Sequence, residues 1–386
     1  MSSRTIDFLR ELVAIDSVNP SLVPGGAGEQ QIAEAMAARL RGIGADVELQ
    51  PVAPGRPNVI GVLEGRRPGP ELILCGHLDT VGVSGMEAPF DPVIRDNRLY
   101  GRGAQDMKGG LAAIVGAVEQ VVATGGPDAG RLVVAGVCDE EDASRGAEAF
   151  VERWRTRGAP GQNSAAVVTE PTDLGVGIAH KGFAWLEVTT TGRAAHGSRP
   201  DEGRDAILRM GRLLARLDEF DRARQAEPGH PLLGAASLHA SFIEGGREWS
   251  TYPDRCQLKL ERRTLPGEDP DEPLLEISRI LEALVGEDDE FAASVEMVFA
   301  RRAYEIPADH VLVERLRQAA VSAGAAGNVC GVSFWADSSV LGEAGLPTVL
   351  FGPGGAGLHG VDEYVRIDDV LICEDALARF ARALAV

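Results

Sequence analysis

Residues 71–79, ELILCGHLD, are a short apolar run that stops at a histidine and an aspartate, and this stretch decides the fold. Three other apolar runs also stop at a charge or a glycine: RLVVAGVCDEE (131–141), SAAVVTE (164–170) and PTVLFGPG (347–354). Runs of this length and composition predict buried strands. In open α/β sheets the ends of such strands form the edge at which ligands bind. The sequence therefore predicts an α/β sheet with polar side chains gathered along one edge.

Helical patterns alternate with these strands over the first 180 residues. The apolar period favours helices over 5–15, 29–43 and 111–123, and strands alternating with helices are typical of an α/β domain. After Pro307 a helix at 310–324 and the strand near 350 resume this pattern. We expect a catalytic domain with a mixed central sheet, made of residues 1–180 and 297–386.

From about residue 181 the order of elements changes. In chain order we predict a strand (183–192), a helix (205–220), two strands (235–246 and 257–265), a helix (272–286) and a strand (292–306). This order, βαββαβ, is the ferredoxin-like α+β arrangement, an antiparallel sheet backed by two helices. We expect it to form an inserted domain over residues 181–296 that interrupts the catalytic domain.

His77 and Asp79 are the first pair with metal-site chemistry. They are two residues apart, so if the strand continues through them both side chains leave the same face. Asp79 then orients the imidazole of His77, because a metal-bound histidine usually donates its other ring N–H to a carboxylate. The pair indicates that His77 binds a metal.

Acidic residues stand at the ends of the later runs. Asp106 lies in GRGAQDMKGG ahead of a helix, where an isolated aspartate would as readily be a helix cap. Glu140 and Glu141 are adjacent at a strand end, so their side chains diverge and one can bind metal while the other faces substrate. A solvated acidic turn is the usual alternative for such a charge run. Glu170 and, far downstream, His359 favour the metal site.

Seven motifs together carry a family resemblance. They are GHLDT (76–80), GRGAQDMKGG (101–110), CDEED (138–142), VVTEPTD (167–173), AAHGSRPDEG (194–203), RRTLPGE (262–268) and FGPGGAGLHGVDEYV (351–365). In order and spacing the chain resembles the zinc aminoacylase, acetylornithine deacetylase and succinyl-diaminopimelate desuccinylase family, which includes glutamate carboxypeptidases and dipeptidases. The resemblance covers nearly the whole chain and implies a zinc-peptidase-like fold.

The resemblance also implies a site with two Zn2+ ions. Asp106 would bridge the ions, His77 and Glu170 would complete one, Glu141 and His359 would complete the other, and Glu140 would be the general base. Nitrogen and oxygen ligands with an open position suit catalytic zinc, whereas structural zinc sites are closed and rich in cysteine. Co2+ or Mn2+ could replace zinc, because carboxylate-rich sites tolerate several metals.

Two residues of the inserted domain are candidates for catalysis and binding. By the same resemblance the inserted domain is a lid that forms a homodimer, and His196 stabilises the oxyanion in the partner's site; the alternative is an exposed loop histidine. Arg263 would hold a substrate carboxylate, which its planar guanidinium matches with two hydrogen bonds. A solvated strand-end arginine is the alternative, and Arg262 takes the role if the strand alternation differs.

Ser250 and Gly354 complete the candidate substrate-binding residues. The family commonly has an asparagine where this chain has Ser250, three residues before a proline. Serine is shorter and lacks the amide, so the contacts to substrate differ there. Gly354 belongs to the stretch before His359 that we expect to form one wall of the pocket.

These residues predict a metal-dependent amidohydrolase that cleaves the amide of a small N-acyl amino acid, as acetylornithine deacetylase-like enzymes do. A dipeptidase or carboxypeptidase is the alternative within the family. A non-catalytic zinc-binding relative is the alternative from another class, and Glu140 beside the ligand Glu141 favours catalysis because a binding protein needs no base there.

Composition excludes several other classes of protein. The formal net charge of -20 argues against nucleic acid and against anionic membranes as partners. No apolar stretch is long enough to span a bilayer, and the N-terminus has the pattern of a helix and not of a signal peptide. The five cysteines form no CxxC pair, which indicates reduced thiols and a cytoplasmic location. Cys75 and Cys138, beside the proposed ligands, are expected to pack as small apolar residues and not to act as nucleophiles.

Overall fold

The computed structural model describes residues 3–156 and 164–384, and the chain divides into two compact units. The first comprises residues 1–178, 306–330 and 336–386, and the second comprises residues 179–305 and 331–335. The second unit extends past residue 296, the predicted end of the inserted domain, because β12 (Ala292–Arg301) continues across that position.

A mixed sheet forms the centre of the first unit, as predicted. Its strands are β1 (Asp46–Ala53), β2 (Arg56–Glu64), β3 (Glu71–His77), β6 (Arg131–Val137), β7 (Ala165–Val168), β8 (Val176–His180) and β15 (Thr348–Leu350). They lie in the order β1-β2-β6-β3-β7-β15-β8, and two short strands of the same sheet, β13 (Tyr304–Glu305) and β14 (Val329–Val332), both pair with β8. The strands β6, β3, β7 and β15 are parallel, and the outer pairs are antiparallel. Every residue of β3 is buried, as its unbroken apolar sequence requires.

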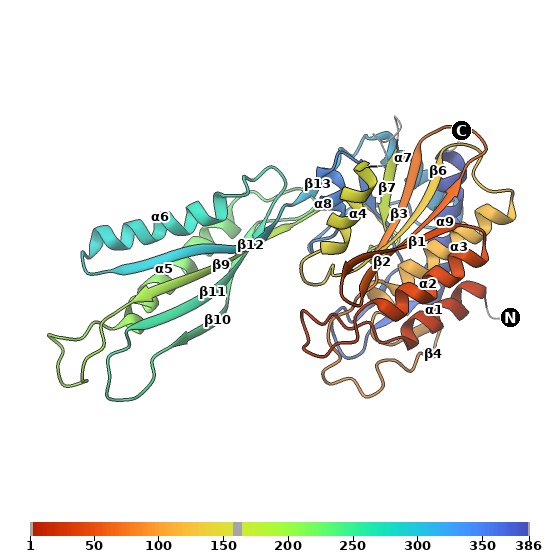
Figure 1. Ribbon diagram of the computed structural model, residues 1–386. Helices are drawn as coiled ribbons and strands as arrows, with labels where there is room; N and C mark the ends of the chain where they lie inside the picture. The colour runs from red at the N-terminus through yellow and green to blue at the C-terminus, as the bar shows by residue number, and fades with distance from the viewer. Residues whose placement is uncertain (1–2, 157–163, 385–386) are drawn as a thin grey trace. The chain divides into compact units, whose positions relative to one another are not determined.

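Helices cover both faces of this sheet (Figure 1). They are α1 (Arg4–Ala14), α2 (Gln30–Gly42), α3 (Gly109–Ala123), α4 (Arg145–Thr156), α7 (Val311–Ala323), α8 (Ser338–Glu343) and α9 (Ile367–Leu384). The helix α3 packs against α1 and α9, and α4 packs against α8. Gly110 in the first turn of α3 lies so close to β7 that a Cβ would come within 2.4 Å of the Thr169 carbonyl oxygen. Only glycine therefore allows α3 to begin at the edge where the strands end.

A small second sheet joins two distant segments beside this edge. Its order is β16-β17-β5-β4, from β16 (Gly355–Ala356), β17 (Tyr364–Arg366), β5 (Arg98–Tyr100) and β4 (Val93–Arg95). In it Tyr364 pairs with Tyr100, which aligns the segment after His359 with the loop that carries Asp106. An irregular turn, Ala104–Lys108, links this loop to α3, and within it Asp106 and Met107 have non-helical backbone angles.

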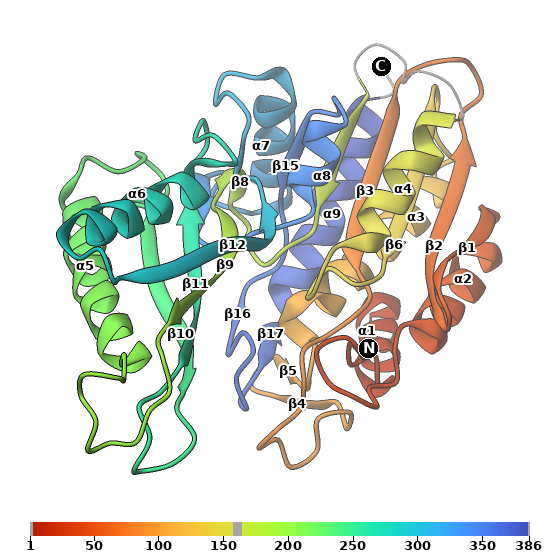
Figure 2. The ribbon, with the colours of Figure 1, turned by 60° about the vertical axis from the view of Figure 1, so that its left-hand side comes forward.

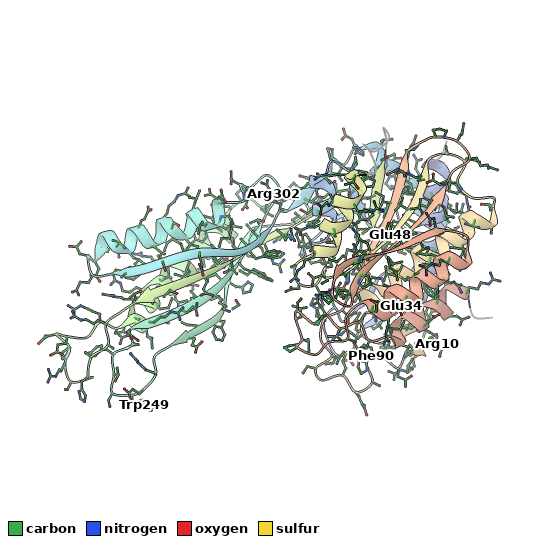
Figure 3. All side chains as sticks on the ribbon, in the orientation of Figure 1. Arg10, Glu34, Glu48, Phe90, Trp249 and Arg302 are labelled. Carbon is green, nitrogen blue, oxygen red and sulfur yellow. The ribbon has the colours of Figure 1, made fainter. Side chains whose placement is uncertain are left out.

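The second unit has the predicted βαββαβ order. Its elements are β9 (Gly182–Thr191), α5 (Ala206–Ala226), β10 (Ser237–Gly245), β11 (Arg255–Thr264), α6 (Glu272–Glu287) and β12, and the antiparallel sheet runs β10-β11-β9-β12. The helices α5 and α6 lie together on one face of the sheet (Figure 2), with Met210 and Ile277 in the shared core. Trp249, between β10 and β11, is fully exposed at the end of its loop (Figure 3).

Two short strands, β13 (Tyr304–Glu305) and β14 (Val329–Val332), lie where the chain passes from one unit to the other. The predicted strand 292–306 is therefore two strands, β12 and β13, interrupted at residues 302–303. Within the described residues no helix is both long and apolar enough to cross a membrane.

Candidate metal centre

Three side chains that could hold a metal ion meet at the carboxyl edge of the central sheet. His77 ends β3, Asp106 lies in the turn before α3, and Glu141 follows β6; one ligand atom of each lies within 4.8 Å of the others. Asp106 faces two histidines, because its Oδ1 is 2.9 Å from His77 Nε2 and its Oδ2 is 3.4 Å from His359 Nε2. His359 Nε2 also lies 3.2 Å from Glu141 Oε2.

Two further carboxylates lie beside this cluster, that of Glu170, which is buried, and that of Glu140, which is partly buried. Burial raises the pKa of Glu170 well above its ordinary value, and the charges of Asp106, Asp337 and Glu141 raise it further, against the opposing effect of His77. Burial is also the first cause of the raised pKa of Glu140, followed among the raising effects by the charge of Glu170. Acids gathered out of solvent in this way need a cation nearby to stay ionised.

The donor set fits a metal cation. Among the described residues, neither Glu141 Oε1 nor Glu170 Oε1 accepts a hydrogen bond, although both atoms are buried. Buried polar atoms without a partner are rare and call for an explanation such as an ion. Imidazole nitrogens and carboxylate oxygens in this combination are ligands for zinc and for neighbouring first-row metals.

Both histidines are held where positive charge is favoured. Hydrogen bonds to Asp106 and Glu141 raise the pKa of His359 to about 10 against the effect of burial. Burial alone lowers the pKa of His77, but the hydrogen bond to Asp106 and the nearby carboxylates raise it well above its ordinary value. His359 also has a left-handed backbone, with φ of 58°, a conformation that is uncommon for a residue other than glycine.

The two local alternatives for the acidic residues are wrong. Asp106 does not cap α3, because the N-cap residue is Lys108 and no side-chain cap bond forms there. Glu141 does not belong to a solvated turn, because its side chain is only 6% exposed.

Asp79 makes contacts that differ from those expected of it. The strand β3 ends at His77, so the shared face that requires a continuous strand does not form. His77 Nδ1 donates to the backbone carbonyl of Asp79 at 2.9 Å, and the Asp79 carboxylate is 3.8 Å away. That carboxylate instead accepts from the backbone N–H groups of Glu140 and Glu141, both at 3.1 Å, and from Asn19 Nδ2 at 2.8 Å. Asp79 thus fixes the backbone of the two glutamates.

A buried polar network that sequence reasoning missed continues behind Asp79. Asn19 also donates to Asp139, whose Oδ1 lies 2.8 Å from Arg56 Nη2. Arg56 in turn donates two hydrogen bonds to Glu29, at 2.6 and 2.8 Å. These residues surround the turn that carries Glu140, and Asp139 has a left-handed φ of 68°. Of these residues, only Asp139 can be singled out from the sequence, because it directly precedes the glutamate pair.

The candidates of the second unit lie on its loops and strand ends. His196 is bridged to Thr251, and Gly197 N–H donates to the Ser250 carbonyl at 2.7 Å, so His196 and Ser250 belong to adjoining loops. His196 Nδ1 is 2.8 Å from Ser198 Oγ. Both His196 and Ser250 are exposed.

The two neighbouring arginines differ in what they can bind. Arg262 is only 1% exposed and is paired with Glu276 and Glu268, so its guanidinium is already occupied. Arg263 is partly exposed and pairs with Glu261, and its guanidinium carbon lies 5.6 Å from the centre of the Phe183 ring. Of the two guanidinium groups, that of Arg263 is therefore the one open to solvent.

Gly354 is closely packed, and the two cysteines near the proposed ligands are buried. Gly354 N–H donates to Asp369 Oδ2 at 3.1 Å, and a Cβ on Gly354 would come within 1.8 Å of Arg366 Nη2. Cys75 and Cys138 are buried, and burial raises the pKa of both thiols. Neither thiol is suited to act as a nucleophile, because the thiolate is the reactive form.

Comparisons with known proteins agree with this architecture. The profile of the family described as Peptidase family M20/M25/M40 matches residues 73–383. Acetylornithine deacetylase of Myxococcus xanthus is 31% identical over 387 residues, covering 96% of this chain and 95% of that protein, and the Photorhabdus laumondii enzyme of the same name is 28% identical, covering 93% and 92%.

Solved structures show the same fold. An M20 family metallo-carboxypeptidase from Sulfolobus solfataricus has a TM-score of 0.81 at 17% identity, covering 100% of both chains. Human carnosine dipeptidase 1 has a TM-score of 0.76 at 19% identity, covering 99% of this chain and 96% of that one. A dinuclear metal-binding peptidase of the M20 family from Bacillus subtilis has a TM-score of 0.74 at 16% identity, covering 98% and 97%.

Proposed function

Because this chain belongs to peptidase family M20/M25/M40, a family of hydrolases, we propose that it is a metal-dependent deacylase that cleaves the amide bond of an N-acyl amino acid. The similarity to acetylornithine deacetylases over 96% of the chain supports this substrate class. The observation that carries the proposal is the position of the Asp106 carboxylate between His77 and His359, with Glu141 at the same cluster.

The ligand positions support two metal ions. Each Asp106 oxygen faces a different histidine, which is the arrangement that a bridging carboxylate needs. His77 and Glu170 would complete one site, and Glu141 and His359 the other. We propose Zn2+ as the native metal, with Co2+ or Mn2+ as substitutes, because the ligands are imidazoles and carboxylates. When bound, such a pair of ions polarises a carbonyl group and lowers the pKa of water towards neutrality.

Glu140 is the proposed general base. Its carboxylate lies next to the proposed ligand Glu141 and is not itself needed as a ligand, as suits a group that takes a proton from water and returns it to the leaving nitrogen. The Asp79 carboxylate holds the Glu140 backbone in place through the 3.1 Å bond to its N–H group. A protein that only bound metal would need no such base beside Glu141, so Glu140 favours catalysis over a binding role.

Substrate recognition is proposed for the second unit. Arg263 offers a planar guanidinium to the α-carboxylate of the amino acid, because Arg262 is already paired. His196 would hydrogen-bond the developing oxyanion, and Ser250 and Gly354 would line the pocket. A dipeptide, or the C-terminal end of a peptide, also has an amide bond next to a free α-carboxylate. Peptidase activity is therefore the alternative.

We also propose a homodimer formed through the second unit. The strand β10 is an edge strand, and its Phe242 and Ile243 are each 50% exposed. An exposed edge with apolar side chains can pair with another copy of the chain. All five cysteines are free, which supports a reducing location such as the cytoplasm.

Amine release tests the proposal. The metal-loaded protein should release amine from N-acetyl and N-succinyl amino acids, with N-acetylornithine in the panel, and a chelator-stripped sample should not. Turnover of dipeptides alone would replace the deacylase by a peptidase. Bound metal without turnover of any substrate in the panel would contradict the proposed activity.

A further inference from the structure

Glu363 is a buried carboxylate whose four hydrogen bonds all come from the loop that carries Asp106. Its Oε1 accepts from the backbone N–H groups of Gln105 at 2.9 Å and Asp106 at 3.1 Å. Its Oε2 accepts from the backbone N–H of Gly103 at 3.0 Å and from Arg102 Nη1 at 2.6 Å. The residue is 1% exposed. One side chain therefore fixes most of the loop.

Arg102 extends the contact to the segment that carries His359. Its Nη2 donates to the carbonyl of Gly360, the residue after His359, at 3.1 Å, and its Nε donates to the Gly82 carbonyl at 3.1 Å. The guanidinium is also buried, with 3% of the side chain exposed. The pairing of β5 with β17 brings the two segments together in this register, and Gly101 N–H donates to the Glu363 carbonyl at 3.2 Å.

We propose that Glu363 and Arg102 are a positioning pair that holds Asp106 and His359 at the spacing required for shared metal binding. This inference rests on the metal centre proposed above. Asp106 must present one oxygen to a ligand on β3 and the other to a ligand more than 250 residues later in the chain, so its backbone has to be fixed against both segments. Glu363 fixes the backbone N–H of Asp106, and Arg102 fixes the carbonyl next to His359. Partners of metal ligands that act in this way raise affinity by preorganising the site.

A purely structural role predicts something different. In that case removing the Glu363 charge would lower stability and leave the metal site intact once the protein is folded. Glu71 offers a matched control in the same unit, at the opposite end of β3 from His77. It is also a buried glutamate, 3% exposed, that pairs with an arginine, Arg131, and accepts a hydrogen bond, from Trp154 Nε1 at 2.6 Å.

The experiment compares Glu363→Gln with Glu71→Gln in the full chain. Glutamine has only one acceptor oxygen, and its amide N–H2 group is a donor. In one orientation this N–H2 group faces the backbone N–H groups of Gln105 and Asp106, and in the other it faces the donors of Arg102 and Gly103. In either orientation two donors lose their acceptor. Zn2+ affinity is measured by competition with a chelating dye, and the Co2+ absorption spectrum reports the ligand geometry. We expect Glu363→Gln to bind Zn2+ about 10- to 100-fold more weakly, with an altered Co2+ spectrum. The control should bind Zn2+ like the wild type.

Equal Zn2+ affinity in wild type and Glu363→Gln overturns the inference, whatever the change in unfolding midpoint. If the wild type itself binds no metal, the proposed function fails, which is a separate result. If Glu363→Gln does not fold, Arg102→Lys replaces it, because a single ammonium group cannot reach both Glu363 and Gly360. Weaker Zn2+ binding by Arg102→Lys supports the inference, and unchanged binding overturns it.

Discussion

The replacement Asp79→Asn tests how the site holds its two adjacent glutamates. The Asp79 carboxylate accepts three hydrogen bonds, from Asn19 Nδ2 at 2.8 Å and from the N–H groups of Glu140 and Glu141 at 3.1 Å. Asp79 is only 1% exposed, so water cannot replace a lost donor at its carboxylate. Asparagine has the same shape but only one acceptor oxygen, so at least one donor must lose its partner.

The size of the effect follows from these contacts. In the better orientation the amide oxygen keeps the bonds from Asn19 and Glu141, and the Glu140 N–H faces the new N–H2 group. A bond to a charged group contributes about 1.5–3 kcal/mol and a neutral one about 0.5–1.5 kcal/mol, so one lost and two weakened bonds should lower the free energy of unfolding by about 3–5 kcal/mol. A displacement of Glu140 by about 1 Å would also lower kcat by about 100-fold.

Urea unfolding of the metal-free proteins and steady-state amine release by the metal-loaded proteins measure the two effects. Glu71→Gln is the control, since it changes a buried carboxylate that contacts Trp154 and not the site. The control should lose stability and keep kcat. An Asp79→Asn protein within about 1 kcal/mol of the wild type, with unchanged kcat, would refute the role assigned to Asp79.

Two further predictions concern the second unit. Burial lowers the pKa of His180 to about 4. The folded protein therefore binds a proton at His180 less tightly than the unfolded chain does. The stability that neutral His180 contributes is complete above about pH 6.5 and is lost as the pH falls through 4. His180→Asn keeps a donor for the Lys181 carbonyl but does not titrate. In urea unfolding, the difference in free energy of unfolding between the wild type and this variant should shrink by about 3 kcal/mol from pH 7 to pH 4. A difference that stays constant with pH would contradict this. Arg263→Lys should lower kcat/KM about 10-fold or more for substrates with a free α-carboxylate, because it loses a bidentate pair. Arg262→Lys disturbs the buried contact to Glu276 and should lower the unfolding midpoint while leaving kcat/KM unchanged. Equal kcat/KM values for the two variants would count against the assignment of Arg263.

The parts of the site that sequence predicts are those with a local signal. The residues at the ends of β3, β6 and β7 follow unbroken apolar runs, and such runs become buried strands whose ends meet at one edge. The βαββαβ order of the second unit is likewise carried by short-range periodicity. His359 has no such pattern around it, and its place in the cluster was predicted only through the family resemblance.

The parts that sequence does not predict depend on contacts between distant residues. The sequence predicts that Asp79 faces the His77 ring, but β3 ends two residues before Asp79, and the Asp79 carboxylate accepts hydrogen bonds from N–H groups 61 and 62 residues away. Glu363 and Arg56 act through partners in other segments. The residues next to each of them in the sequence do not indicate that its charge is buried. The predicted domain boundary at residue 296 lies inside β12, whereas the second compact unit continues to residue 305.

The measurement that tests the central claim most directly is the activity and zinc content of Glu140→Gln. Glutamine preserves the shape of the side chain but cannot accept a proton, and Glu140 lies outside the proposed ligand set. We predict that the variant keeps the zinc content of the wild type while kcat for N-acyl amino acid cleavage falls by about 100-fold or more. Wild-type zinc content together with wild-type kcat would contradict the account of this site as a hydrolytic centre with Glu140 as its base.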